Sequence, residues 1–136
     1  MKAFLALLVI SAATAAFAGQ AVGASNIGIT IRHQKVGCHA WAIGNGAYKA
    51  TQSLTVKAGT SLSFTNNDVM PHALVQLSGP RIAIHSARLA KMGAHTAFVL
   101  LKPGTYVFGT KVGEDYTKGI VTVGEDNVLR LVVTVK

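Results

Sequence analysis

The sequence predicts an all-β domain, an antiparallel sandwich or barrel of seven to eight short strands. Isoleucines alternate with small or polar residues at 27–31, which is the period of two of a half-buried strand. Short apolar or alternating runs then recur along the chain, separated by turns rich in glycine, proline and asparagine. Residues 82–92 alone break this pattern, and a short helix or an irregular loop is expected there.

The turns divide the rest of the chain into strands. Gly59 lies in one turn, residues 78–80 and 102–104 combine glycine with proline in two others, and residues 124–127 separate the last two strands. In chain order, the expected strands cover residues 27–31, 54–57, 61–65, 73–77, 96–101, 105–110, 120–123 and 128–135, and the short run at 41–43 is compatible with a further strand.

The N-terminus has the pattern of a secretory signal peptide. Lys2 precedes an apolar run over 3–18, and the run ends in the small-x-small sequence Ala16-Phe17-Ala18. Cleavage after Ala18 leaves one domain over 19–136, so a periplasmic or extracellular location is expected. No later segment approaches the roughly 20 apolar residues of a membrane span, and no stable membrane insertion is expected after cleavage.

The chain carries a formal net charge of +8, which favours an acidic partner. The basic residues are scattered and do not alternate with aromatic residues, so nucleic-acid binding is not expected. The single cysteine, Cys38, has no partner for an internal disulfide. In an exported protein such a cysteine is a free thiol, an intermolecular bridge or a metal ligand.

Strand direction predicts which loops lie together. If successive strands reverse, the strand over 61–65 runs toward His72, and the strands beginning near His39 and after Met92 start at the same end. The loop that carries Cys38 lies there as well. Alternation of direction therefore gathers thiol, imidazole and thioether groups, which are the ligands that copper prefers.

Two segments resemble the cupredoxin, or blue-copper, family. LTVKAGTSLSFTNNDVMPHALV at 54–75 is similar to the family's strand, turn and strand before its first histidine ligand, here His72. KPGTYVFGTKVGEDYTKGIVTV at 102–123 is similar to its final turn, strand, ligand loop and last strand. The resemblance implies a cupredoxin-like Greek-key β-sandwich. In plastocyanin-like members the strand with the tyrosine leads into cysteine, histidine and methionine ligands, whereas here it leads into Thr110 and a loop without them.

The ligand types missing from that loop occur elsewhere, and we expect a relocated copper site. Its predicted ligands are the Cys38 thiolate, the His39 and His72 imidazoles and the Met92 thioether, the ligand set of a type 1 copper centre. Trp41 is expected to pack beside the site. Asn67 and Asp68 are candidates to orient the loop or to support the ligands.

Each ligand has an alternative interpretation. Cys38 and Met92 are also residue types that pack in apolar cores, which is the alternative to metal binding for both. The alternative for His72 is a loop histidine that is hydrogen-bonded to the backbone. Neighbouring residues of a strand face opposite sides, so only one of Cys38 and His39 can face the metal if both are extended. In that case His33 or His95 supplies the second imidazole, and Met70 is a further thioether candidate.

These observations predict an exported copper protein that transfers electrons, with copper and an acidic redox protein as partners. A copper chaperone or buffer, which holds Cu(I), and a metal-free β-sandwich binding module are the alternatives. The sequence has no nucleophile and base at the spacing of a known catalytic motif, and it has no glycine-rich phosphate loop. An enzyme is therefore not expected.

Overall fold

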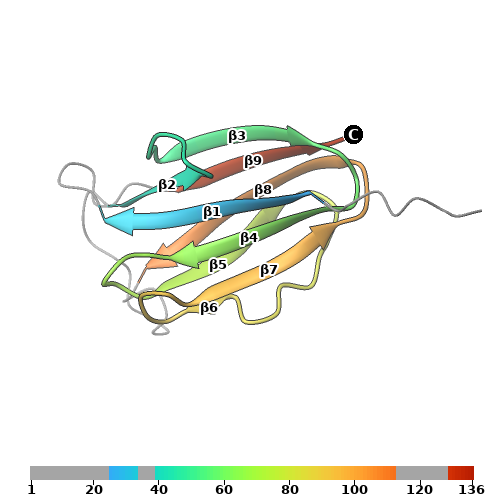
Figure 1. The fold of residues 1–136 in the computed structure, drawn as a ribbon. Coiled ribbons are helices and arrows are strands. Elements are labelled where there is room, and N and C mark those ends of the chain that lie inside the picture. The colour runs from blue at the N-terminus through green and yellow to red at the C-terminus, as the bar shows by residue number, and fades with distance from the viewer. Residues whose placement is uncertain (1–24, 34–38, 113–128) are drawn as a thin grey trace, which may run out of the picture.

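The computed structural model describes residues 25–33, 39–112 and 129–136, and within them it contains nine strands and no helix (Figure 1). The all-β prediction is therefore confirmed, with more strands than expected. No helix in the described residues has the length and apolar character of a membrane span. The strands are β1 (Asn26–His33), β2 (His39–Ile43), β3 (Thr51–Val56), β4 (Thr60–Asn66), β5 (His72–Ser78), β6 (Arg88–Leu89), β7 (His95–Leu100), β8 (Gly104–Val112) and β9 (Arg130–Val135).

The stretch 82–92, where the sequence predicts a helix or an irregular loop, is irregular apart from the two residues of β6. β6 pairs with the start of β5 and extends the sheet edge there. The strand expected at 120–123 lies outside the described residues.

The strands form two sheets, with the orders β2-β1-β4-β7 and β3-β9-β8-β5-β6. The sequence pattern suggests antiparallel pairing throughout. The structure differs, because β1 pairs with β4 in parallel and β3 pairs with β9 in parallel. The reason is that the chain leaves the first sheet after β2, forms β3 in the second, and returns as β4 beside β1. Parallel neighbours need such a crossover, which a run of tight turns does not provide.

The predicted gathering of loops at one end agrees with these pairings. β1 and β4 run toward that end, and β8 does so as well because it is antiparallel to β5. β2, β5 and β7 begin there, since β2 is antiparallel to β1, β7 is antiparallel to β4, and the loop from β4 leads directly into β5. We call this end, where β4 ends and β5 begins, the histidine end.

The core is apolar along most of its length and becomes polar at the histidine end. Facing residues of β1 and β2 pair as Ile29 with Ile43, Ile31 with Trp41, and finally His33 with His39. On β4, the buried Leu62 and Phe64 are likewise followed by a buried Asn66. A ring cluster fills the middle of the core and includes Trp41, Phe64, Phe98, Tyr106 and Phe108. Trp41 therefore packs beneath the histidines, as expected.

Candidate metal centre

Asp68 joins two buried histidines at the histidine end. Its Oδ2 atom lies 2.8 Å from His39 Nδ1 and 3.1 Å from His72 Nε2. The side chains of Asp68 and His72 are 0% exposed and that of His39 is 1% exposed. An ionised carboxylate only accepts hydrogen bonds, so both imidazoles donate to the same oxygen. This sharing fixes which ring nitrogen carries the proton in each histidine.

The loop between β4 and β5 holds Asp68 in place through its own side chains. The Asn66 Nδ2 group donates to the carbonyls of Met70 and Leu89, both at 2.9 Å. The Asp68 N–H donates to Asn66 Oδ1 at 2.8 Å, and the Met70 N–H donates to Asp68 Oδ1 at 3.0 Å. Such short-range bonds from Asn and Asp are typical of tight turns. One carboxylate oxygen is thus used by the backbone, and the other faces the imidazoles.

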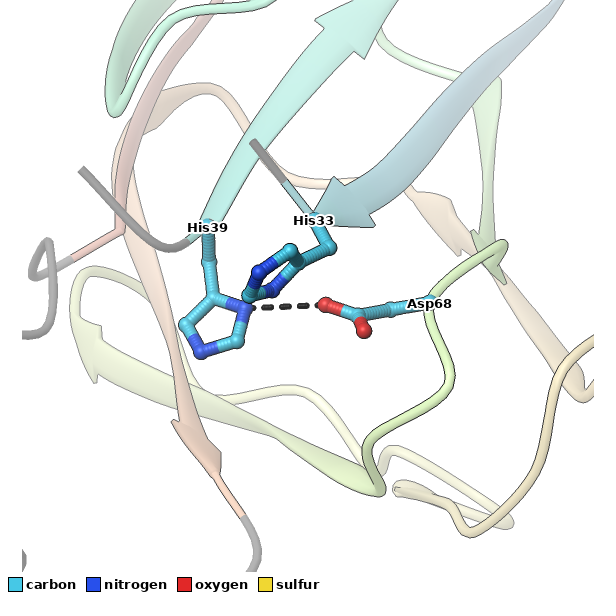
Figure 2. A group of neighbouring side chains, drawn as sticks. All are labelled: His33, His39 and Asp68. Carbon is cyan, nitrogen blue, oxygen red and sulfur yellow. Dashed lines mark hydrogen bonds and ion pairs between the residues drawn. The ribbon is translucent and has the colours of Figure 1, made fainter. Parts of the chain in front are cut away.

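The rings of three histidines contact one another in sequence. The His33 and His39 rings have centroids 5.5 Å apart at 72°, and the His39 and His72 rings are 4.9 Å apart at 89°. His33 is exposed, whereas His39 and His72 are buried. Figure 2 shows His33 and His39 extending from the ends of neighbouring strands toward the Asp68 carboxylate. The His33 and His39 nitrogens and an Asp68 oxygen lie within 4.8 Å of one another.

The environment keeps Asp68 charged and His72 neutral. Burial raises the pKa of the Asp68 carboxyl, but hydrogen bonds from Met70, His72 and His39 outweigh burial and hold the pKa below its ordinary value of 3.8. Burial lowers the pKa of His72 below 6.5, and the bond to Asp68 only partly opposes it. At neutral pH, His72 is therefore an uncharged imidazole with its proton on Nε2.

Nδ1, the other ring nitrogen of His72, differs from Nε2 in its surroundings. Within the described part of the chain, His72 Nδ1 is buried and accepts no hydrogen bond. A buried polar atom without a partner costs about 1–3 kcal/mol. A neutral imidazole nitrogen with a lone pair is also the form that binds a metal ion, and a carboxylate behind the ring is its usual support.

A second buried polar group, the Thr110 hydroxyl, lies near His72 on the neighbouring strand. The Thr110 Oγ1 atom is buried and, among the described residues, has no hydrogen-bond partner. Thr110 is in register with Leu74, and His72 precedes Leu74 by two residues on the same face of β5. Thr110 is also where the strand with Tyr106 leads into cysteine in plastocyanin-like proteins.

The predicted ligands are placed as follows. His39 and His72 are brought together by Asp68, and Cys38 lies outside the described residues, one position before His39. Met92 is at the same end, because the N–H of the next residue, Gly93, donates to the Asn66 carbonyl at 2.7 Å. Its side chain is 54% exposed, and its role as a ligand stays a prediction.

His95, the alternative second imidazole, lies on the outer surface. It pairs with Thr65, which stands between the buried Phe64 and Asn66 on β4. Alternation places both Thr65 and His95 on the face away from the core. His33, the other alternative, points to the cluster. The sequence offers little to place His33 in the cluster, because His33 lies opposite His39 only through the pairing of β1 with β2.

Neither a scan against protein-family models nor a search of curated proteins found a match. Among solved structures, the chain is similar to a variant of the McoA multicopper oxidase from Aquifex aeolicus, with a TM-score of 0.52 and 17% identity. That match covers 82% of this chain and 26% of the oxidase, so this chain spans about a quarter of the oxidase's length.

Two smaller proteins are also similar in structure. A purple cupredoxin from Nitrosopumilus maritimus matches with a TM-score of 0.44 and 20% identity, over 80% of this chain and 98% of that protein. A methionine-to-alanine mutant of amicyanin, in its Cu(I) form, matches with a TM-score of 0.44 and 19% identity, over 85% of each chain. At such identities the likeness concerns the fold alone. By the order of strands in its two sheets and its match to part of the oxidase, the chain has a cupredoxin-like fold, as its segments 54–75 and 102–123 predict.

Proposed function

We propose that this protein binds one copper ion at the histidine end and carries electrons through it. The observation that supports this most is the His72 Nδ1 atom, which is buried and unpaired within the described residues. The opposite nitrogen of the same ring is held by Asp68 at 3.1 Å. A metal ion at Nδ1 would remove the cost of the unpaired atom, and Asp68 would keep the ring oriented toward it.

The proposed ligands are His72 and His39 as imidazoles, Cys38 as a thiolate and Met92 as a weaker thioether. Copper bound by such a set exchanges one electron between Cu(II) and Cu(I). His72 and Asp68 are fully buried, and the aromatic side chains of Trp41 and Phe64 lie in the layer beneath. A dry and rigid surround limits the movement of ligands and solvent when the charge of the metal changes.

The loop that carries ligands in plastocyanin-like proteins bears on this proposal. Thr110 has no thiol, and no cysteine, histidine or methionine occurs in 111–119. Cys38 is the single cysteine of the chain, so a copper–thiolate bond can come from no other residue of the same chain. The proposed copper–thiolate bond therefore requires Cys38. This residue precedes His39, which lies in the cluster with Asp68.

A second candidate function is a copper buffer or chaperone. The exposure of Met92, 54%, supports it, because a thioether at the surface can pass Cu(I) to a partner. Colour separates the two roles. A type 1 centre absorbs strongly in the visible range when oxidised, through charge transfer from the thiolate, whereas a protein that binds only Cu(I) is colourless.

The experiment loads the purified chain from residue 19 with Cu(II) and records visible absorption and electron paramagnetic resonance. Wild type should show an intense visible band that Cys38→Ser abolishes, while His95→Gln, on the outer face, should match wild type. Identical spectra for wild type and Cys38→Ser would contradict the thiolate. Failure of wild type to take up stoichiometric copper would favour a metal-free binding module instead.

We also propose that the protein is exported and acts outside the cytoplasm as a carrier, not as an enzyme. The N-terminal run over 3–18 and its Ala16-Phe17-Ala18 end support the export. N-terminal sequencing of protein from cells should begin at Gly19. An intact Met1 would contradict cleavage.

An acidic electron-transfer partner is part of the same proposal. Cleavage removes Lys2 and takes the net charge from +8 to +7, which supports such a partner. Arg88, Lys91 and Lys111 are exposed on elements that meet at the histidine end. Attraction between opposite charges speeds association at low ionic strength and is screened by salt.

A further inference from the structure

His33, His39 and Asp68 form a second group of potential ligands, separate from the unpaired nitrogen of His72. Their ligand atoms lie within 4.8 Å of one another and come from β1, from β2 and from the loop after β4 (Figure 2). His39 and Asp68 are buried, and His33 is exposed. The group therefore joins two fixed donors to one donor that faces solvent.

Two of the three donors are already held in position. The Met70 N–H binds Asp68 Oδ1 and leaves Oδ2 directed at His39, 2.8 Å from Nδ1. His33 and His39 are directly paired across β1 and β2, so their side chains leave the same face of the sheet. The sheet and the loop thus bring the three groups together without a metal.

We propose that His33, His39 and Asp68 bind a divalent cation of intermediate softness, with Zn²⁺ as its representative. Two imidazoles and one carboxylate suit such ions, and this set contains no sulfur to favour Cu(I). Three protein ligands leave a coordination position open, and the exposed His33 places the group at the solvent boundary.

Zinc binding would require small movements, with His33 moving inward and the His39–Asp68 pair moving slightly apart. Donor atoms around a tetrahedral zinc ion lie about 3.3 Å apart, given bonds of about 2.0–2.1 Å. His39 Nδ1 and Asp68 Oδ2 are closer than this, at 2.8 Å, because a hydrogen bond joins them. A zinc ion would take the place of the Nδ1 proton, which would pass to Nε2 or to solvent, and the two atoms would move apart by about 0.5 Å. His33 is the last residue of β1 and is exposed, so its ring can rotate toward the pair without disturbing the core.

This site does not depend on the proposed copper function. It shares His39 and Asp68 with the copper site but does not use His72, Cys38 or Met92. The test therefore uses the chain from residue 19 with the substitutions Cys38→Ser and His72→Gln, which remove the thiol and the unpaired nitrogen. ZnCl₂ is titrated into this metal-free background protein by calorimetry, alone and with His33→Gln or His95→Gln added.

The background protein should bind one Zn²⁺. His33→Gln should weaken binding by at least about 10-fold, since losing even a group that supports a ligand costs that much. His95→Gln is the matched control, an exposed histidine of the same end on the outer face, and should bind as the background protein does. No binding by the background protein, or equal binding with and without His33, would overturn the proposal.

Nuclear magnetic resonance of the imidazoles provides a second measurement that needs no substitution at the site. In the background protein, Zn²⁺ should shift the ring signals of His33 and His39 and leave those of His95 unchanged. Shifts confined to other histidines would overturn the proposal. Because copper uptake is measured on wild type, a failure of either metal site is seen separately from the other.

Discussion

At the scale of single residues, the organising group is Asp68. One carboxylate oxygen accepts from two imidazoles, and the other accepts from the backbone. The sequence marks Asp68 only as a possible support, because nothing in a linear pattern shows that His39 lies within 2.8 Å of it. His72 could be predicted, since it follows a recognisable strand, turn and strand.

Replacement of Asp68 should loosen the whole cluster. Asp68→Asn keeps the size of the side chain but replaces the carboxylate with an uncharged amide. The amide has no charged oxygen to accept the hydrogen bonds of both His39 and His72. We expect a loss of about 1–3 kcal/mol in the free energy of unfolding, measured by denaturant titration of the metal-free protein. The exposed neighbour provides the control, and Asn67→Ala should stay within about 0.5 kcal/mol. Equal stability of the two variants would refute the role given to Asp68.

The pKa of His72 predicts how stability depends on pH. Its folded pKa lies below the ordinary 6.5, so between the two values the unfolded chain binds more protons than the folded chain. The contribution of His72 is therefore complete above about pH 6.5 and is lost as pH falls through its folded pKa. Denaturant titrations of metal-free protein between pH 5 and 8 should show a smaller decline for His72→Gln than for His95→Gln. Equal slopes for both would contradict the burial effect.

At the scale of strands, local alternation predicts the elements well but not their partners. The strands at 61–65, 73–77 and 105–110 agree with β4, β5 and β8, since glycine and proline turns bound them in the sequence. Register and parallel pairing depend on contacts between distant residues. The pairing of His33 with His39 depends on β1 meeting β2 across 34–38, and no periodicity encodes it.

The turn after β5 allows a test of how closely its backbone approaches the backbone of β8. Gly79 has a φ of +104°, and a Cβ there would lie 2.5 Å from the carbonyl oxygen of Thr105. Gly44 also has a positive φ, +54°, but a Cβ there would have no atom within 4 Å. Both alanine variants carry backbone strain, and only Gly79→Ala adds a clash with the backbone.

We expect Gly79→Ala to lower the free energy of unfolding by at least about 1 kcal/mol more than Gly44→Ala does. Denaturant titration of the two variants measures the difference. If both cost the same, the contact between this turn and β8 is looser than the structure places it.

At the scale of the whole molecule, two sheets enclose an apolar core whose last layer is polar. His39, Asn66, Asp68 and His72 are all at most 1% exposed. Such a layer weakens a core unless each polar group is paired, and His72 Nδ1 is unpaired within the described residues. The fold therefore carries a cost at the histidine end that a bound metal would offset.

Metal binding should accordingly stabilise the folded chain. A copper concentration 100 times the dissociation constant adds about 2.7 kcal/mol to the free energy of unfolding, provided that copper binds only the folded state. Thermal unfolding with and without copper measures this, and a chelator should reverse the gain. An unchanged melting temperature in excess copper would contradict binding to the folded chain.

The central claim is that copper is held through His72, and copper content tests it most directly. Wild type, His72→Gln and His95→Gln are loaded with equimolar copper, desalted and analysed for metal by mass spectrometry. Wild type and His95→Gln should retain one copper per chain, and His72→Gln should retain far less, with its affinity lowered at least about 10-fold. Retention of copper by His72→Gln at the level of wild type would contradict the account.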